Sequence, residues 1–161
     1  MLLSLPPELH LLIISNLSFP DLTCLKVTCS YFYHLIPPMS HEELLEAECT
    51  AFAIDKDLYA CRYCLRLRSG GRFADRMLRR RRGRRGRHAG RRFCVQCGLK
   101  PRGDSGEARY GPGAQVVMMG TAYVLCAECR RLGVAGMQRV GAMQPGALSH
   151  LCEQCWGKNR E

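Results

Sequence analysis

Near the middle of the chain stands Cys94-Val95-Gln96-Cys97-Gly98, which contains one of four Cys-x-x-Cys pairs in the sequence. The other pairs are Cys61/Cys64, Cys126/Cys129 and Cys152/Cys155. Two residues between cysteines allow a tight turn to aim both sulfurs at one metal ion, and a following glycine eases such a turn. Because four pairs supply two complete four-cysteine sites, the sequence predicts two structural zinc ions with no coordination position left open for water.

How the four pairs combine is a separate question, since they can pair sequentially, crossed or nested. β-prone runs at 114–118 and 121–125 flank Gly120 and predict a hairpin that returns Cys126 towards Cys97. This favours a zinc-ribbon-like site made of Cys94, Cys97, Cys126 and Cys129. The second site is then made of Cys61, Cys64, Cys152 and Cys155. A sequential pairing is supported nearly as well.

Size and cysteine spacing also bear on the compartment. The 161 residues, 47% hydrophobic, allow one ordinary domain or two small ones, and domains that small often need a metal or a partner. Regular Cys-x-x-Cys pairs suit metal better than short-loop disulfides, which indicates a reducing interior such as the cytosol or nucleus. The alternative is a secreted disulfide protein, but the first residues lack a basic segment and are interrupted by Pro6 and Pro7. The longest apolar run is far below the roughly 20 residues that cross a bilayer.

The first 38 residues predict three short helices. Pro7 and Glu8 suit a first helical turn, and Leu9 begins an apolar stripe at helical spacing. Pro20 and Asp21 start a second helix, and a third apolar element follows before Pro37 and Pro38. These helices carry more apolar side chains than so small a unit can bury, so part of their surface is expected to bind a partner.

The same residues resemble a known motif. Leu5-Pro6-x-Glu8 is followed by Asp21-Leu22 and by an apolar-Cys-aromatic ending, and this pattern resembles the F-box, the adaptor-binding motif of SCF ubiquitin ligases. The resemblance implies docking on the Skp adaptor through Leu5, Pro6, Leu9, Ile13, Leu22, Leu25 and Val27. Cys24 and Cys29 are then expected to be small buried hydrophobes and not ligands.

A connecting helix is predicted within 39–57. Ser40 and Glu43 have the spacing of a capping box. The expected buried face carries Leu45, Cys49 and Phe52, with Leu44, Ala47 and Ala51 beside them. The expected wetter side carries Glu42, Glu46 and Glu48. His41 and Cys49 are possible ligands, as are His88 and His150 further along, but packing or bystander roles are favoured for all four.

An arginine run lies between the first two cysteine pairs. The formal net charge is +10, and residues 76–92, here called the arginine run, hold ten arginines and no acidic residue. Glycines and self-repulsion predict a disordered, solvated loop. Its functions could be binding nucleic-acid phosphates, nuclear localisation, holding an acidic or phosphorylated protein segment, or linking alone. The candidate anion-binding residues are Arg79, Arg80, Arg81, Arg82, Arg84 and Arg85.

Together these features predict an F-box at 1–38, a connecting helix at 39–57 and a cysteine-rich region at 58–161. The fold class is a small helical unit followed by a zinc-stabilised, irregular α/β region of zinc-ribbon type. That region, with Cys-x-x-Cys-Leu-Arg-Leu-Arg at 61–68, resembles a group of fungal F-box proteins with cysteine pairs behind the box. The chain shows no catalytic constellation, so we expect a non-catalytic ligase adaptor that binds a protein target. The alternative is a zinc-ribbon protein that binds nucleic acid through the arginine run.

Overall fold

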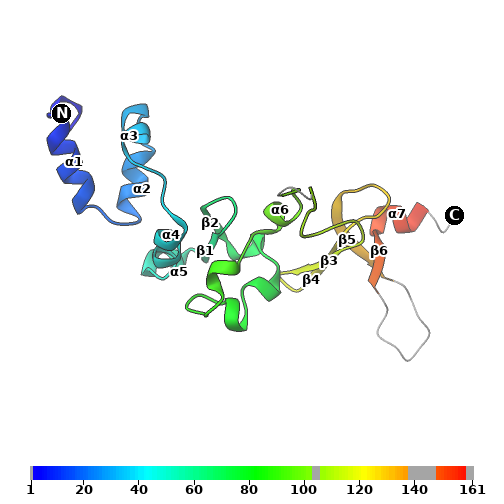
Figure 1. Ribbon diagram of the computed structural model, residues 1–161. Coiled ribbons are helices and arrows are strands. Elements are labelled where there is room, and N and C mark those ends of the chain that lie inside the picture. Colours follow the sequence, from blue (N-terminus) through cyan, green and yellow to red (C-terminus); the bar gives the residue numbers. More distant parts are fainter. Residues whose placement is uncertain (1, 103–105, 138–147, 159–161) are drawn as a thin grey trace.

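A computed structural model describes residues 2–102, 106–137 and 148–158. Its elements follow one another in chain order along an elongated molecule (Figure 1). A helical unit lies at one end, a small sheet with short helical turns lies in the middle, and a larger sheet with a C-terminal helix lies at the other end. Within the described residues, every helix is too short or too polar to span a bilayer.

The helical unit confirms the three predicted helices. After a short 3-10 turn at Leu2–Ser4 it consists of α1 (Pro7–Asn16), α2 (Asp21–Lys26) and α3 (Ser30–Leu35). Its contact between α1 and α3 is centred on His10, which is only 3% exposed. His10 Nδ1 lies 2.9 Å from the Tyr31 hydroxyl, and the imidazole packs edge-on against Phe32. His10 is the only buried residue of α1; Leu9, Leu11 and Leu12 are exposed, and Ile13 and Ile14 are half-buried.

The connecting segment is two helices and not one. The capping box of Ser40 and Glu43 is confirmed at the start of α4 (His41–Ala47). The chain then turns, and Thr50 caps α5 (Ala51–Asp55) by accepting a hydrogen bond from the Ala53 amide. The predicted buried face is confirmed in part: Leu44 and Ala47 are buried and Leu45 and Cys49 are half-buried, but Phe52 is 43% exposed. Glu48, expected on the wetter side, is the most deeply buried acidic residue of the described part.

The middle unit is built around a two-stranded antiparallel sheet of β1 (Leu58–Cys61) and β2 (Arg66–Ser69). Four 3-10 turns follow, at Gly70–Arg72, Asp75–Met77, Arg80–Arg82 and Ala89–Arg91, before α6 (Val95–Gly98). Phe73, Met77, Val95 and Tyr110 pack with three cysteines in its core. The arginine run is therefore folded, and the prediction of a disordered loop was wrong.

The C-terminal unit is a four-stranded antiparallel sheet in sequential order. Its elements are β3 (Gln115–Met118), β4 (Thr121–Leu125), β5 (Leu132–Met137), β6 (Leu148–Cys152) and α7 (Glu153–Lys158). The β3–β4 hairpin confirms the prediction around Gly120, and Met119 and Gly120 both have positive φ, as a two-residue hairpin turn requires. Asp75 ties this turn to the middle unit, since its carboxylate accepts hydrogen bonds from the amides of Met119 and Gly120. The cysteine-rich region thus has two cores and is not a single zinc ribbon.

Candidate metal centres and partner-binding surface

The eight paired cysteines form two clusters. The first cysteine cluster is Cys61, Cys64, Cys94 and Cys97, and the second is Cys126, Cys129, Cys152 and Cys155. Within each cluster the four sulfurs lie within 4.8 Å of one another, and all are free thiols. Zinc–sulfur bonds of about 2.3 Å in a tetrahedron place sulfurs about 3.8 Å apart. Cys129 Sγ and Cys152 Sγ are 3.8 Å apart, so the donor set and its spacing fit a four-coordinate ion.

The favoured ribbon pairing was wrong, and the sequential alternative is the one observed. The hairpin does form, but it returns the chain to residue 113: the Gly113 amide donates to the Leu125 carbonyl at 2.7 Å. Cys97 is not there, because the chain after it folds back locally and the Tyr110 amide donates to the Gly98 carbonyl at 2.9 Å.

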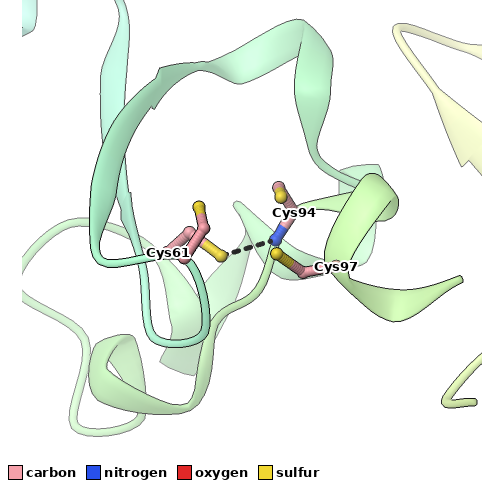
Figure 2. Close-up of side chains that lie close together, drawn as sticks. Cys61, Cys94 and Cys97 are labelled. Atoms are coloured by element: carbon pink, nitrogen blue, oxygen red, sulfur yellow. Dashed lines mark hydrogen bonds between the residues drawn. The ribbon is translucent and has the colours of Figure 1, made fainter. Parts of the chain in front are cut away.

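The first cysteine cluster is formed where two turns meet. Cys61 ends β1, Cys64 lies in the following turn, and Cys94 and Cys97 lie at the start of α6. The two turns are joined by backbone: the Arg62 amide donates to the Arg92 carbonyl at 3.1 Å. The Cys94 amide donates to Cys61 Sγ at 3.3 Å, which Figure 2 shows. Such amide–sulfur bonds stabilise thiolate charge next to a metal.

Electrostatics within this cluster divide the thiols into two kinds. A hydrogen bond from the Cys94 thiol, aided by backbone amides, lowers the pKa of Cys61 to about 4 despite its burial. The same bond and burial raise the pKa of Cys94, and burial raises the pKa of Cys97. The pKa of Arg68 is raised by its hydrogen bond to Cys64, so a cation stands beside the sulfurs. Because thiolate is the metal-binding form, the lowered pKa of Cys61 favours metal binding by this cluster.

The second cysteine cluster connects the end of β4 to the junction of β6 and α7. The Ala127 amide donates to the His150 carbonyl at 3.1 Å, which holds the two turns together. Burial opposes ionisation of Cys126, but amide hydrogen bonds from Cys152, Cys129 and Glu128 outweigh it and lower its pKa to about 6. Burial and the neighbouring thiols raise the pKa of Cys155 to about 12. The cluster therefore also holds one thiol ready to ionise near neutral pH.

The remaining cysteines and histidines lie outside both clusters. Neither cluster contains His41, His88, His150, Cys24, Cys29 or Cys49. The exposed His150 ring lies 3.4 Å from the Gly113 carbonyl, where it supports the hairpin. Cys24 is exposed and not buried as predicted.

Gly98 has a role beyond easing the cysteine turn. A methyl group at this position would lie 2.4 Å from a Tyr110 ring carbon and 2.9 Å from one of Phe93. Because both rings are packed in the core, Gly98→Ala is expected to destabilise the middle unit by about 1–3 kcal/mol. Thermal unfolding of the metal-loaded chain measures this. Gly111→Ala is the matched control, since nothing lies within 4 Å of its added methyl; equal effects of the two variants would contradict the packing explanation.

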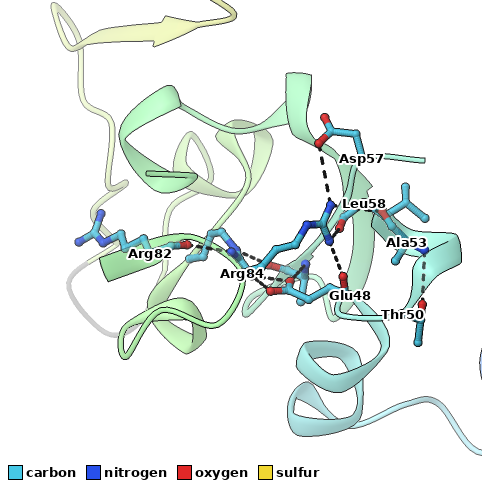
Figure 3. Close-up of polar contacts among 9 residues, drawn as sticks. Glu48, Thr50, Ala53, Asp57, Leu58, Arg82 and Arg84 are labelled. Carbon is cyan, nitrogen blue, oxygen red and sulfur yellow. Dashed lines mark hydrogen bonds and ion pairs between the residues drawn. The ribbon is translucent and has the colours of Figure 1, made fainter. Parts of the chain in front are cut away.

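Two arginines of the run point inward. Arg92 is fully buried, and its Nη2 donates to both carboxylate oxygens of Glu48, which is 1% exposed. Arg84 donates to the backbone carbonyls of Glu48, Leu58 and Ala53, and its guanidinium stacks on the Tyr59 ring. Figure 3 shows Arg84 reaching from the run into the end of α4, α5 and β1.

These contacts explain why the arginine run is ordered. The carbonyls at the ends of short helices lack partners within the helix, and here a guanidinium supplies the hydrogen bonds. Arg84 is therefore a structural residue and not a free anion ligand, contrary to the prediction for it. No sequence signal separates Arg84 and Arg92 from the other arginines of the run, so sequence reasoning missed both roles.

The predicted adaptor-binding residues lie on the helical unit as a largely open surface. Leu5 is 37% exposed, Leu9 43% and Val27 72%, and Pro6 is also exposed. Ile13, Leu22 and Leu25 are half-buried and support the helices. Other exposed apolar side chains of the helical unit are Leu2, Leu3, Leu11, Leu12, Tyr31 and Tyr33. An apolar surface this extensive on so small a unit is typical of a protein-binding face.

Comparison with known proteins identifies this part of the chain. Residues 2–39 match the family model described as F-box-like. The matched segment ends just before α4, so the two cysteine clusters lie entirely outside it. No curated protein and no solved structure matches the chain.

Proposed function

We propose that this chain, whose residues 2–39 are F-box-like, is a substrate-receptor subunit of an SCF-type ubiquitin ligase. The helical unit docks on the Skp adaptor, and the cysteine-rich region binds a protein target. The function requires no catalytic group in this chain. By binding both proteins, the chain raises the local concentration of the target next to a ubiquitin-charged enzyme held elsewhere in the complex.

The exposed apolar face of α1 and α2 is the observation that carries the proposal. Leu9 and Leu12 of α1 are 43% and 59% exposed, and Val27 after α2 is 72% exposed. Leaving these side chains in water is unfavourable by roughly 25 cal/mol for each Å² of apolar surface that a partner would cover. A partner that covers this face therefore gains affinity and also supplies the packing that α1 lacks.

The two metal centres provide the rigid part of the receptor in this proposal. We assign zinc to both, because four thiolates in a tetrahedral set are the ligands that structural zinc prefers. The first centre joins β1 to α6, and the second joins β4 to α7. Each ion thus fixes a small sheet whose surrounding loops are free to contact a target.

Substitution of the motif opening tests the docking part of the proposal. The double variant Leu5→Ala, Pro6→Ala is expected to weaken binding to the purified Skp adaptor by about 2 kcal/mol or more, roughly 30-fold, because truncated apolar anchors of an interface have effects of this size. Binding is measured by co-purification and by titration of the metal-loaded, nuclease-treated chain.

The matched control carries two truncations elsewhere. Val117→Ala, Val134→Ala removes exposed apolar side chains from the C-terminal sheet and leaves the helical unit intact. Circular dichroism and bound metal should be the same for both double variants. Equal binding of the native chain and the Leu5, Pro6 variant would contradict docking through this motif.

A further inference from the structure

Five arginines of the run line one hollow. Its volume is about 460 Å³, and its lining consists of Arg76, Arg79, Arg80, Arg81, Arg82 and His88. Arg84 and Arg85, which the sequence placed in the same anion-binding set, are not part of this lining. Figure 3 shows the side chains of Arg82 and Arg84 leaving the run in opposite directions. The run therefore separates into Arg84 and Arg92, which bind Glu48 and backbone carbonyls, and a group that lines the hollow, here called the arginine hollow. Two members of this group also contact the core beneath it: Arg82 donates to the Met77 sulfur at 2.9 Å, and Arg76 stacks on the Tyr110 ring.

The backbone beneath the arginine hollow is held in place. The His88 amide donates to the Arg81 carbonyl at 2.8 Å, and buried Arg92 donates to the Arg82 carbonyl at 2.8 Å. Gly86 allows the run to fold back, since a Cβ there would lie 2.3 Å from the Arg81 carbonyl oxygen. Arg80 has a φ of 54°, an unfavourable conformation for a non-glycine residue that the surrounding contacts maintain. The guanidinium groups are thus carried by an ordered loop, which reduces the entropy lost when a ligand binds.

The positive charge of the arginine hollow is largely uncompensated. Asp75 reaches Arg79 at 3.5 Å, but its carboxylate also accepts the two amides of the β3–β4 turn. Among the described residues, no carboxylate forms an ion pair with Arg76, Arg80, Arg81 or Arg82. The pKa of His88 is lowered by burial and by repulsion from the surrounding arginines. An anion that enters would relieve the repulsion among these groups.

We infer that the arginine hollow binds a phosphoryl group carried by a protein segment. A guanidinium presents paired N–H donors that match phosphate oxygens, and several of them around one concave site suit a compact dianion. Sequence-tolerant nucleic-acid binding instead uses a groove along the backbone with aromatic side chains for stacking, and the lining holds no Phe, Tyr or Trp. This inference rests on the proposed receptor function and names the chemistry of its target, a phosphorylated protein.

Peptide binding to the full, metal-loaded chain tests the inference. The probes are a fluorescent peptide with one phosphoserine among neutral residues, the same peptide with serine, and a single-stranded RNA of uridines. We expect the phosphopeptide to bind about tenfold or more tighter than its serine twin. Arg80→Gln, Arg81→Gln should reduce phosphopeptide affinity about tenfold or more, since each change removes a charge-assisted hydrogen bond. Binding should also raise the pKa of His88, observed by NMR of its ring protons.

The matched control removes the same charge from exposed positions of the same run. In the double variant Arg85→Gln, Arg87→Gln both changed residues are exposed and outside the lining. The variant should change phosphopeptide affinity less than about threefold, because salt screens the attraction between these distant charges and the phosphate. Equal losses in the two double variants, or no preference for phosphoserine, would overturn the inference. RNA binding that exceeds phosphopeptide binding and depends on the same arginines would overturn it in favour of nucleic acid. Adaptor binding is measured separately, so failure here is distinguishable from failure of the receptor proposal.

Discussion

Removal of metal by a strong chelator is expected to unfold both sheets of the cysteine-rich region. Three of the five buried residues in the core of the C-terminal unit are themselves cysteines of the second cluster, so little apolar packing remains without the ion. Structural zinc contributes about 10–16 kcal/mol of apparent binding free energy in small peptides, far more than so small a core can replace. Loss of the β signal in circular dichroism and rapid proteolysis measure the effect.

Controls for metal removal come from the chain itself. Returning zinc should restore the fold, and Cys126→Ser should weaken the second centre as chelation does. Cys49→Ser, which alters a thiol outside both clusters, should behave as the native chain does. Unchanged circular dichroism and protease resistance after verified metal loss would refute a structural role for the ions.

Loss of the buried Arg92 guanidinium is the substitution with the largest expected effect on stability outside the cysteines. Arg92→Met leaves the Glu48 carboxylate buried without its partner, and breaking a buried ion pair in this way costs about 3–5 kcal/mol. The Arg82 carbonyl also loses its donor, and the arginine run loses one of its two inward anchors. Chemical denaturation of the metal-loaded chain measures the loss.

A second variant separates the stranded charge from simple loss of packing. In the native chain the Ala60 amide donates to the Glu48 carboxylate. Glu48→Gln in the Arg92→Met background removes the unpaired charge and keeps an oxygen that can accept this hydrogen bond. About 1 kcal/mol or more should be recovered. Arg91→Met, at the exposed neighbouring position, should change stability by less than about 0.5 kcal/mol. A loss in Arg91→Met as large as that in Arg92→Met would contradict the buried-pair explanation.

Features specified by nearby residues were predictable from the sequence. The three N-terminal helices, the Ser40 capping box and the hairpin at Gly120 each depend on a few adjacent side chains and on backbone preferences. The eight cysteines of the two clusters were identified from spacing alone, since a Cys-x-x-Cys turn is itself a local structure.

Long-range contacts were not predictable in the same way. The pairing of the cysteine turns depends on where the chain returns after Gly98. The Tyr110 amide donates a hydrogen bond to the Gly98 carbonyl, and adjacent residues do not indicate this contact. The order of the arginine run depends on Glu48, which lies 44 residues before its partner Arg92. The burial of Glu48 reverses the usual preference of a glutamate for an exposed position. Composition correctly indicates a repulsive, basic segment, but it cannot show that two of the arginines find buried acceptors.

Complex formation between the native, zinc-loaded chain and the purified Skp adaptor tests the central claim most directly. After nuclease treatment, the two proteins are mixed and analysed by size-exclusion chromatography with light scattering. The receptor function predicts one complex with one copy of each protein, in which hydrogen exchange of α1 and α2 slows. Separate elution of a folded chain and a functional adaptor, with unchanged exchange in these helices, would contradict it.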